Sequence, residues 1–255
     1  MRKIIILITL LITISFIILI YNKIFVHNYK IKIEAASAFY PFSVELVQEV
    51  YSEDEFSEGL LKMVSTSQAY EDIITGKTDI IIASEPSDEQ KKMIKKSGVN
   101  LEFKSLYLEP LAILINNENN IDNLSIDQIQ QIYYEDNSTW NTYQLERNNG
   151  SQTCFESIVK NNKLGNNHYE IKTMPKIVDE IALDKKGIGY AFYSYYSEMH
   201  TNNSAKIINV NGNSIYDKDY PLLFEVFLIY RKDNNNENIL KIVNWIEKTE
   251  GQELD

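Results

Sequence analysis

The sequence predicts an α/β protein of two lobes, preceded by one apolar segment. Two observations lead to this prediction. Between residues 31 and 96, short apolar runs alternate with amphipathic stretches in the order strand, helix, strand, helix, strand, helix, which is typical of a mostly parallel sheet. Two long extended runs, Leu106 to Ile115 and Leu222 to Tyr230, flank a second α/β region. We expect these two runs to cross between the lobes.

The first segment is not expected to belong to the folded part. Arg2 and Lys3 precede an apolar run from Ile4 to Ile20, whose length is at the lower limit for a membrane span. The same pattern is found in secretory signals. No small-residue cleavage site and no cysteine follow the run directly. We therefore expect residues 1–28 to be an uncleaved signal-anchor that holds the protein on the extracytoplasmic face of the cell membrane, and cleavage with secretion is the alternative.

Composition excludes several kinds of partner. The chain of 255 residues carries 25 Lys and Arg against 36 Asp and Glu, a net charge of −11. Nucleic-acid-binding proteins concentrate positive charge, so no nucleic acid partner is expected. A single cysteine excludes a disulfide within the chain and a cysteine-rich zinc site. The three histidines are widely separated, and no metal or cofactor is predicted.

Local signals delimit the elements of the first region. The expected strands are 31–34, 60–64 and 79–83, and the expected helices follow Pro41, Ser67 and Ser87. Proline is tolerated in the first turn of a helix. Gly76 is placed to end the second helix, and Ser87 with Gln90 forms a capping box for the third.

The second region has its own helices and strand. An amphipathic helix is expected over 124–133, capped at Ser125, and another from Pro175 to Lys186. A strand is expected over 188–192 and a last helix over 239–248. We therefore assign residues 29–113 and 220–255 to the first lobe and residues 114–219 to the second.

The segment from Glu146 to Thr153 has the features of an anion site. It reads Glu-Arg-Asn-Asn-Gly-Ser-Gln-Thr and opens a helix. The start of a helix presents unpaired backbone N–H groups at the positive end of the helix dipole, where anions bind. Ser151 and Thr153 add hydroxyl donors, and Arg147 adds a planar fork that can bind two oxygens of an oxyanion. A surface loop with a helix-capping serine is the alternative.

Other polar residues follow the ends of the predicted strands. These residues are Ser37, Thr66, Ser67, Ser84 and Glu85. Ligands of parallel sheets bind beyond the carboxyl ends of the strands, so a shared site is predicted there. The alternative is that these side chains only cap helices.

Five stretches in order resemble one family. Arg147-x-x-Gly150-Ser151-x-Thr153 resembles the anion-binding segment of the phosphate-binding subunits of bacterial phosphate ABC transporters. Residues 35–41, 66–84, 124–140 and 187–190 resemble the same family in the same order. The resemblance covers roughly residues 30 to 251. It implies a type II periplasmic-binding-protein-like fold, in which two crossover strands join the lobes.

The resemblance also implies a set of ligand-binding residues. The implied set is Ser37, Ala38, Phe39, Thr66, Ser67, Glu85, Arg147, Ser151, Gln152 and Thr153. Glu85 stands where the family has an aspartate, and its carboxylate would accept the proton of hydrogen phosphate, which sulfate lacks. Gln152 replaces a family glycine, and Gln68 and Ala69 replace two others, so side chains are expected where bare backbone approaches the ligand.

The function implied by the resemblance is capture of inorganic phosphate for an ABC importer, with the permease subunits as partners. The alternative is a membrane-tethered oxyanion sensor or surface module without transport duty. Catalysis is not expected. A cysteine phosphatase built on Cys154 would need arginine at position 160, where the sequence has Lys160.

Overall fold

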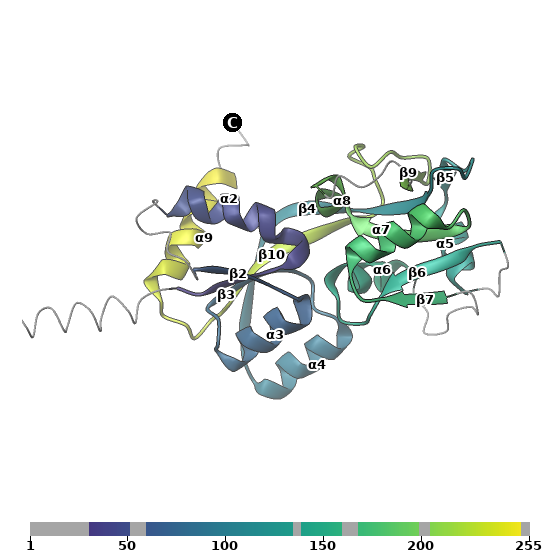
Figure 1. Cartoon of the computed structure of the whole chain (residues 1–255). Helices are drawn as coiled ribbons and strands as arrows, with labels where there is room; N and C mark the ends of the chain where they lie inside the picture. Colours follow the sequence, from purple (N-terminus) through teal and green to yellow (C-terminus); the bar gives the residue numbers. More distant parts are fainter. Residues whose placement is uncertain (1–30, 52–59, 135–138, 160–167, 199–204, 251–255) are drawn as a thin grey trace, which may run out of the picture.

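The computed structural model describes residues 31–51, 60–134, 139–159, 168–198 and 205–250 (Figure 1). The expected signal-anchor, residues 1–28, and the expected loop over 161–167 lie outside these ranges. Within the described ranges, no helix is long and apolar enough to cross a membrane.

A single ten-stranded sheet runs through the molecule. Its strand order is β2-β1-β3-β10-β4-β8-β6-β7, while β5 and β9 pair beside this path. The bounds in that order are Leu61–Val64, Ile33–Ala36, Ile80–Ser84, Leu223–Arg231, Leu101–Asn116, Gly187–Phe192, Asn141–Leu145 and His168–Ile171, with Asn123–Leu124 for β5 and Ala205–Val210 for β9. Strand β1 is parallel to β2 and β3, and β6 is parallel to β7 and β8, as the alternating pattern predicts.

Strand β4 joins the two lobes. Its residues 101–110 pair with β10, and its residues 111–116 pair with β8 and β9. The predicted first crossing is therefore confirmed, within a longer strand. The prediction for the return crossing was wrong in position. Strand β10 pairs with β3 and the first part of β4 along its length, so the chain returns over residues 211–222, before β10 begins.

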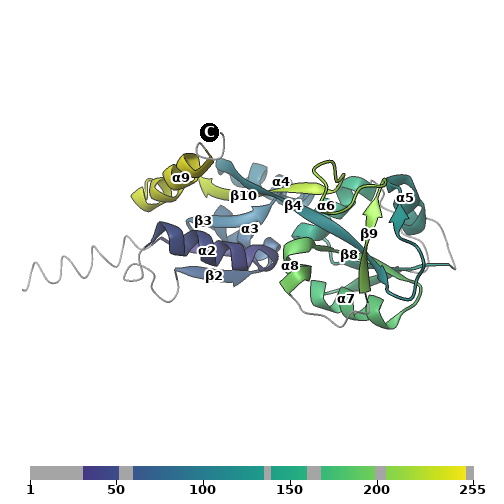
Figure 2. The same ribbon diagram turned by 90° about the horizontal axis from the view of Figure 1, so that it is seen from above.

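The helices cover both sides of the sheet in each lobe (Figures 1 and 2). In the first lobe, α2 and α9 lie on one face and α3 and α4 on the other. The bounds are Ser37–Phe39 for the short η1, Tyr40–Val50 for α2, Thr66–Thr75 for α3, Asp88–Ser97 for α4 and Glu237–Glu250 for α9. The second lobe contains α5 to α8, with bounds Ile126–Tyr134, Gly150–Val159, Met174–Leu183 and Tyr193–Glu198.

Most of the local signals act as predicted. Pro41 lies in the first turn of α2. Gly76 ends α3 with φ of 72°, a left-handed conformation that glycine adopts without a Cβ clash. Ser87 and Gln90 form the capping box of α4. Helix α7 ends at Leu183, earlier than expected, because the chain turns at Asp184 into β8.

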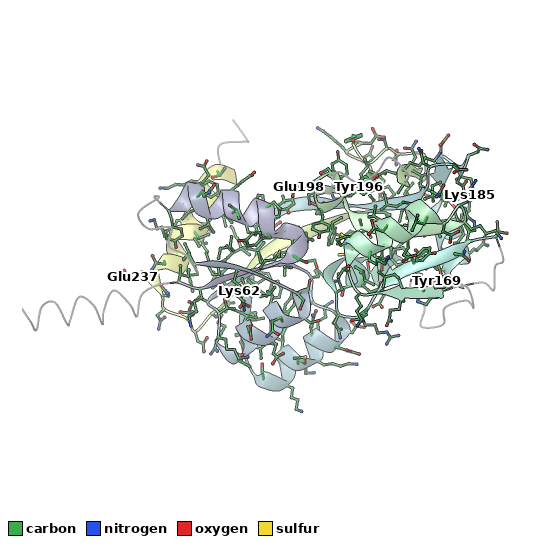
Figure 3. All side chains as sticks on the ribbon, in the orientation of Figure 1. Lys62, Tyr169, Lys185, Tyr196, Glu198 and Glu237 are labelled. Atoms are coloured by element: carbon green, nitrogen blue, oxygen red, sulfur yellow. The ribbon has the colours of Figure 1, made fainter. Side chains whose placement is uncertain are left out.

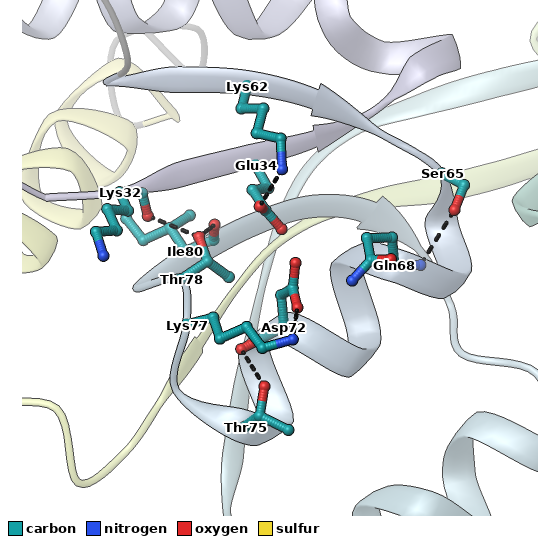
Figure 4. Close-up of polar contacts among 10 residues, drawn as sticks. All are labelled: Lys32, Glu34, Lys62, Ser65, Gln68, Asp72, Thr75, Lys77, Thr78 and Ile80. Carbon is teal, nitrogen blue, oxygen red and sulfur yellow. Dashed lines mark hydrogen bonds and ion pairs between the residues drawn. The ribbon is translucent and has the colours of Figure 1, made fainter.

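One charged cluster lies partly buried between β1 and α3 (Figure 4). Glu34 on β1 is only 7% exposed and pairs with Lys62 Nζ at 3.5 Å. Asp72 on α3 pairs with Lys77 Nζ at 3.0 Å. Burial raises the pKa of Glu34, and the charge of Asp72 raises it further, whereas Lys62 lowers it. The second carboxylate oxygen of Glu34 has no hydrogen-bond partner among the described residues.

Candidate functional site

The start of α6 in the second lobe touches two elements of the first lobe. The backbone N–H of Gly150 donates to Oγ1 of Thr66, at the start of α3, at 3.1 Å. A Cβ added at Gly150 would lie 2.7 Å from Oγ of Ser84, the last residue of β3. A larger residue at this position would force the Ser84 or Thr66 side chain to shift. The contact brings Thr66, Ser84 and Gly150 together at the carboxyl ends of the first-lobe strands.

The loop before α6 is held against the first lobe by Asn148. This residue has φ of 65°, a left-handed conformation that asparagine adopts more readily than most residues. Its carbonyl accepts hydrogen bonds from Ser67 Oγ at 3.0 Å and from Gln90 Nε2 at 3.3 Å. Its side chain accepts from Ser87 Oγ at 2.6 Å and donates to Glu89 Oε2 at 2.6 Å. Asn148 therefore links the starts of α3 and α4 to the second lobe.

The predicted residues of α6 point in different directions. Ser151 is fully buried, and its hydroxyl donates to Asn149 Oδ1 at 3.2 Å. Thr153 has a buried Oγ1 without a hydrogen-bond partner among the described residues. The side chain of Gln152 accepts a hydrogen bond from the Tyr190 hydroxyl and donates to Glu156 at 3.0 Å.

The side chain of Gln152 points into its own lobe. The residue is 1% exposed, and it is not among the residues that line the pocket described below. Its place in the ligand-binding set stays a prediction. The partner that turns the side chain inward is Tyr190, which is fully buried on β8.

The residues of the first predicted strand end lie at another part of the interface. Ser37, Ala38 and Phe39 form η1, where Ser37 is exposed and Phe39 is buried. The Phe39 ring packs on that of Phe192 with centroids 5.0 Å apart. Helix α8, which carries the labelled Tyr196 and Glu198 in Figure 3, borders η1 at this junction.

Helix α8 is held in place by the crossing strand. Glu109 of β4 is 2% exposed and accepts a hydrogen bond from the Ser194 N–H at 2.8 Å. Burial raises the pKa of Glu109, while this bond opposes the shift.

Arg147 and Glu85 line an open pocket of about 660 Å³ beside these contacts. Arg147 is exposed and has no hydrogen bond or ion pair with any residue that the structure describes. Glu85 is also exposed and pairs with Lys91 at 3.7 Å. The other lining residues are Pro86, Ser87, Asp88, Glu89, Lys91, Lys92, Asn148, Thr153, Cys154, Glu156, Ser157, Leu223, Phe224 and Glu225.

The predicted residues thus fall into three groups. Glu85, Arg147 and Thr153 line the pocket. Thr66, Ser67 and Ser151, with the inward-turned Gln152, lie at or behind the contact between the lobes. Ser37, Ala38 and Phe39 lie beside α8, outside the pocket lining.

Sequence reasoning missed Asn148 and its contacts with Ser87 and Gln90. The signal was present, since Asn148-Asn149-Gly150 is a turn sequence and asparagine tolerates positive φ. The capping box of α4 was predicted only as a helix start. Ser87 and Gln90 also bind Asn148 in the loop before α6 of the other lobe, and this contact depends on the tertiary structure.

The site has no activated thiol. Cys154 is 4% exposed, and burial raises the pKa of its thiol to about 12. The thiol is therefore protonated near neutral pH, which makes it a poor nucleophile. In the described part of the chain, no group of three or more His, Cys, Asp or Glu residues is placed to hold a metal ion.

A family profile for the PBP superfamily domain matches residues 27–247. The chain belongs to this superfamily. Its members are binding proteins, and the chain is accordingly not an enzyme. Among curated relatives, it is 25% identical over 243 residues to the phosphate-binding protein PstS of Staphylococcus epidermidis, which covers 82% of this chain and 72% of the relative.

Solved structures of two other proteins share the fold. A Clostridium perfringens protein, assigned as a phosphate ABC transporter substrate-binding protein and solved with bound phosphate, superposes with a TM-score of 0.69 at 17% identity. That superposition covers 88% of this chain and 95% of the other. An ABC-type phosphate transport receptor from Vibrio cholerae superposes with a TM-score of 0.65 at 15% identity, covering 88% and 96%. The two-lobed α/β architecture predicted from sequence is therefore confirmed.

Proposed function

We propose that this PBP superfamily member is an extracytoplasmic solute-binding protein that captures hydrogen phosphate between its lobes for an ABC importer. The observation that supports this most is the meeting of α6 with α3 and β3 at Gly150, Thr66 and Ser84. Helix N-termini at the carboxyl ends of strands are where oxyanions bind in α/β proteins. The phosphate-binding relatives support the choice of anion.

Binding exchanges one set of hydrogen bonds for another. Where the lobes touch, Oγ1 of Thr66 accepts a hydrogen bond from the N–H of Gly150. An entering oxyanion competes for that N–H, so the lobes must part before they close around it. Ser151, Thr153 and Arg147 then donate from the α6 side, and Thr66 and Ser67 donate from α3. Ser37 and the N–H groups of Ala38 and Phe39 contribute from η1, and Glu85 accepts the proton of hydrogen phosphate.

The net charge of −11 makes these short-range donors necessary. The field of the whole chain repels an anion, so affinity must come from groups in direct contact with it. The alternative is a membrane-tethered oxyanion sensor. The absence of a cysteine near the apolar run at residues 4–20 favours that alternative over a lipid-anchored transport subunit.

Calorimetry of the full-length chain with phosphate, sulfate, arsenate and molybdate tests the proposal. We expect heat with phosphate and arsenate, which carry a proton near neutral pH, and little with sulfate. Absence of heat with all four anions would overturn it. Co-purification with permease subunits then separates the transport role from the sensor role.

A further inference from the structure

The pocket beside the lobe contact is larger than inorganic phosphate requires. Its volume of about 660 Å³ falls within the range of roughly 300–1,000 Å³ that is usual for pockets holding small organic molecules. A tetrahedral oxyanion fills only a small part of that space. The remaining walls must therefore face either solvent or another part of a ligand.

One side of the pocket is suited to an anionic group. Arg147 carries a charge with no ion-pair partner among the described residues, and the same is true of Lys92 on α4. Thr153 lines the same pocket, and its Oγ1 is buried and has no hydrogen-bond partner among the described residues. A phosphoryl group would pair with the two cations.

The pocket as a whole is not suited to an anion alone. Its lining holds the carboxylates of Glu85, Asp88, Glu89, Glu156 and Glu225, five against the three cations of Lys91, Lys92 and Arg147. Of these carboxylates, only Glu85 pairs with a cation among the described residues, namely Lys91. Within the described part of the chain, Glu156 and Glu225 accept hydrogen bonds only from the neutral groups of Gln152 and Ser105.

The wall beside Glu225 is apolar. Leu223 and Phe224, at the start of β10, line the pocket next to it. A short carbon chain could pack on these side chains, between a phosphoryl group at Arg147 and a positive charge at the carboxylates. Each charge of such a ligand would meet an opposite charge, whereas a simple anion would leave the acidic wall unpaired.

We infer that this pocket also binds zwitterionic phosphate monoesters, in which an ammonium group is joined to the phosphoryl group by a short carbon chain. The inference rests on the proposed function, because it assigns the phosphoryl end to the same Arg147 side of the site. Glu156 and Glu225 are the residues that recognise the ammonium group.

Titration calorimetry with three probes tests this assignment on the full-length chain. The probes are inorganic phosphate, ethyl phosphate and O-phosphoethanolamine, and the last two differ by the ammonium group. We expect O-phosphoethanolamine to bind roughly twofold to fivefold more tightly than ethyl phosphate, the effect of about one exposed charge pair. The double variant Glu156→Gln/Glu225→Gln should remove this preference. Glu170→Gln, the same chemical change on β7 outside the pocket, should retain it.

The outcomes separate the two proposals. If phosphate binds but the ammonium group adds no affinity, the zwitterion assignment is wrong and the phosphate function stands. A preference that survives in the double variant also overturns the assignment, because other groups then recognise the ammonium. If none of the three probes binds, the proposed function itself fails, and this inference fails with it.

Discussion

The N–H of Gly150 in the second lobe donates to Oγ1 of Thr66 in the first lobe, at 3.1 Å. This bond uses a donor that the proposed function assigns to the anion. When the lobes are in contact, the Thr66 hydroxyl therefore accepts the hydrogen bond that a ligand oxygen would accept. Together with the four hydrogen bonds of Asn148, it holds the lobes together.

Gly150→Ala should weaken this contact. The new Cβ would lie 2.7 Å from Ser84 Oγ and 3.0 Å from Thr66 Oγ1, so we expect a loss of roughly 1–3 kcal/mol in the free energy of unfolding. Urea denaturation measures it. Adding Ser84→Ala removes the closer atom, which has no hydrogen-bond partner among the described groups, and should restore part of the loss. Unchanged stability in Gly150→Ala would show that the lobes do not approach this closely.

Asn148→Ala should open the interface. It removes two side-chain bonds and places alanine at φ of 65°. We expect a larger radius of gyration by small-angle X-ray scattering. Asn148→Gly keeps the carbonyl bonds and adopts the φ freely, so its effect should be smaller. The control is Asn211→Ala, which brings the same strain at φ of 52° within the second lobe. An equal expansion in the control would mean that strain, and not the lost contacts, is responsible.

Arg147→Ala should weaken phosphate binding without changing stability. The guanidinium has no partner within the described ranges, so the free energy of unfolding should not change. A hydrogen bond to a charged ligand contributes about 1.5–3 kcal/mol, and calorimetry should therefore show a loss of roughly ten- to 150-fold in affinity. Lys172→Ala, an exposed cation outside the pocket, is the control. If Arg147→Ala binds phosphate as tightly as the parent, the anion does not bind on the Arg147 side of the site.

Glu85→Gln should change selectivity and leave the fold intact. The amide can donate to an unprotonated oxygen, so the affinity for phosphate should fall and that for sulfate should rise. Glu85 is exposed, which limits the change in the ratio to roughly twofold to fivefold. Lys91→Ala breaks the same ion pair but keeps the carboxylate, and it should not improve sulfate binding. If the ratio of phosphate affinity to sulfate affinity is unchanged in Glu85→Gln, Glu85 is only a surface carboxylate and does not select the anion.

Glu34→Gln should stabilise the protein more at pH 7 than at pH 4. The pKa of Glu34 is raised in the folded state, mainly by burial and then by Asp72. The folded state therefore binds this proton more tightly than the unfolded state, and stability falls as pH rises from the ordinary pKa of 4.5 through the raised value. A neutral amide removes that loss. Chemical denaturation at both pH values measures this difference in stability, with the partly exposed Glu102→Gln as the control. An equal effect at both pH values would contradict the raised pKa.

The sequence by itself determined the local elements and the class of fold. Pro41, Gly76 and the pair Ser87 and Gln90 act through backbone geometry and hydrogen bonds within a few residues of themselves, so their effects could be predicted without the rest of the chain. The alternation of strands and helices likewise indicated a parallel sheet, because each element must bury its apolar face against the next. The motif around Arg147 indicated an anion site for the same local reason.

Only the tertiary structure decided how these parts meet. The direction of the Gln152 side chain depends on Tyr190 of β8, and the role of Asn148 depends on α3 and α4 of the other lobe. The position of the return crossing depends on which strands pair with β10. In each case the deciding partner lies far away in the chain. Contacts of this kind are set by packing and hydrogen bonding across the whole fold, which no local pattern of residues specifies.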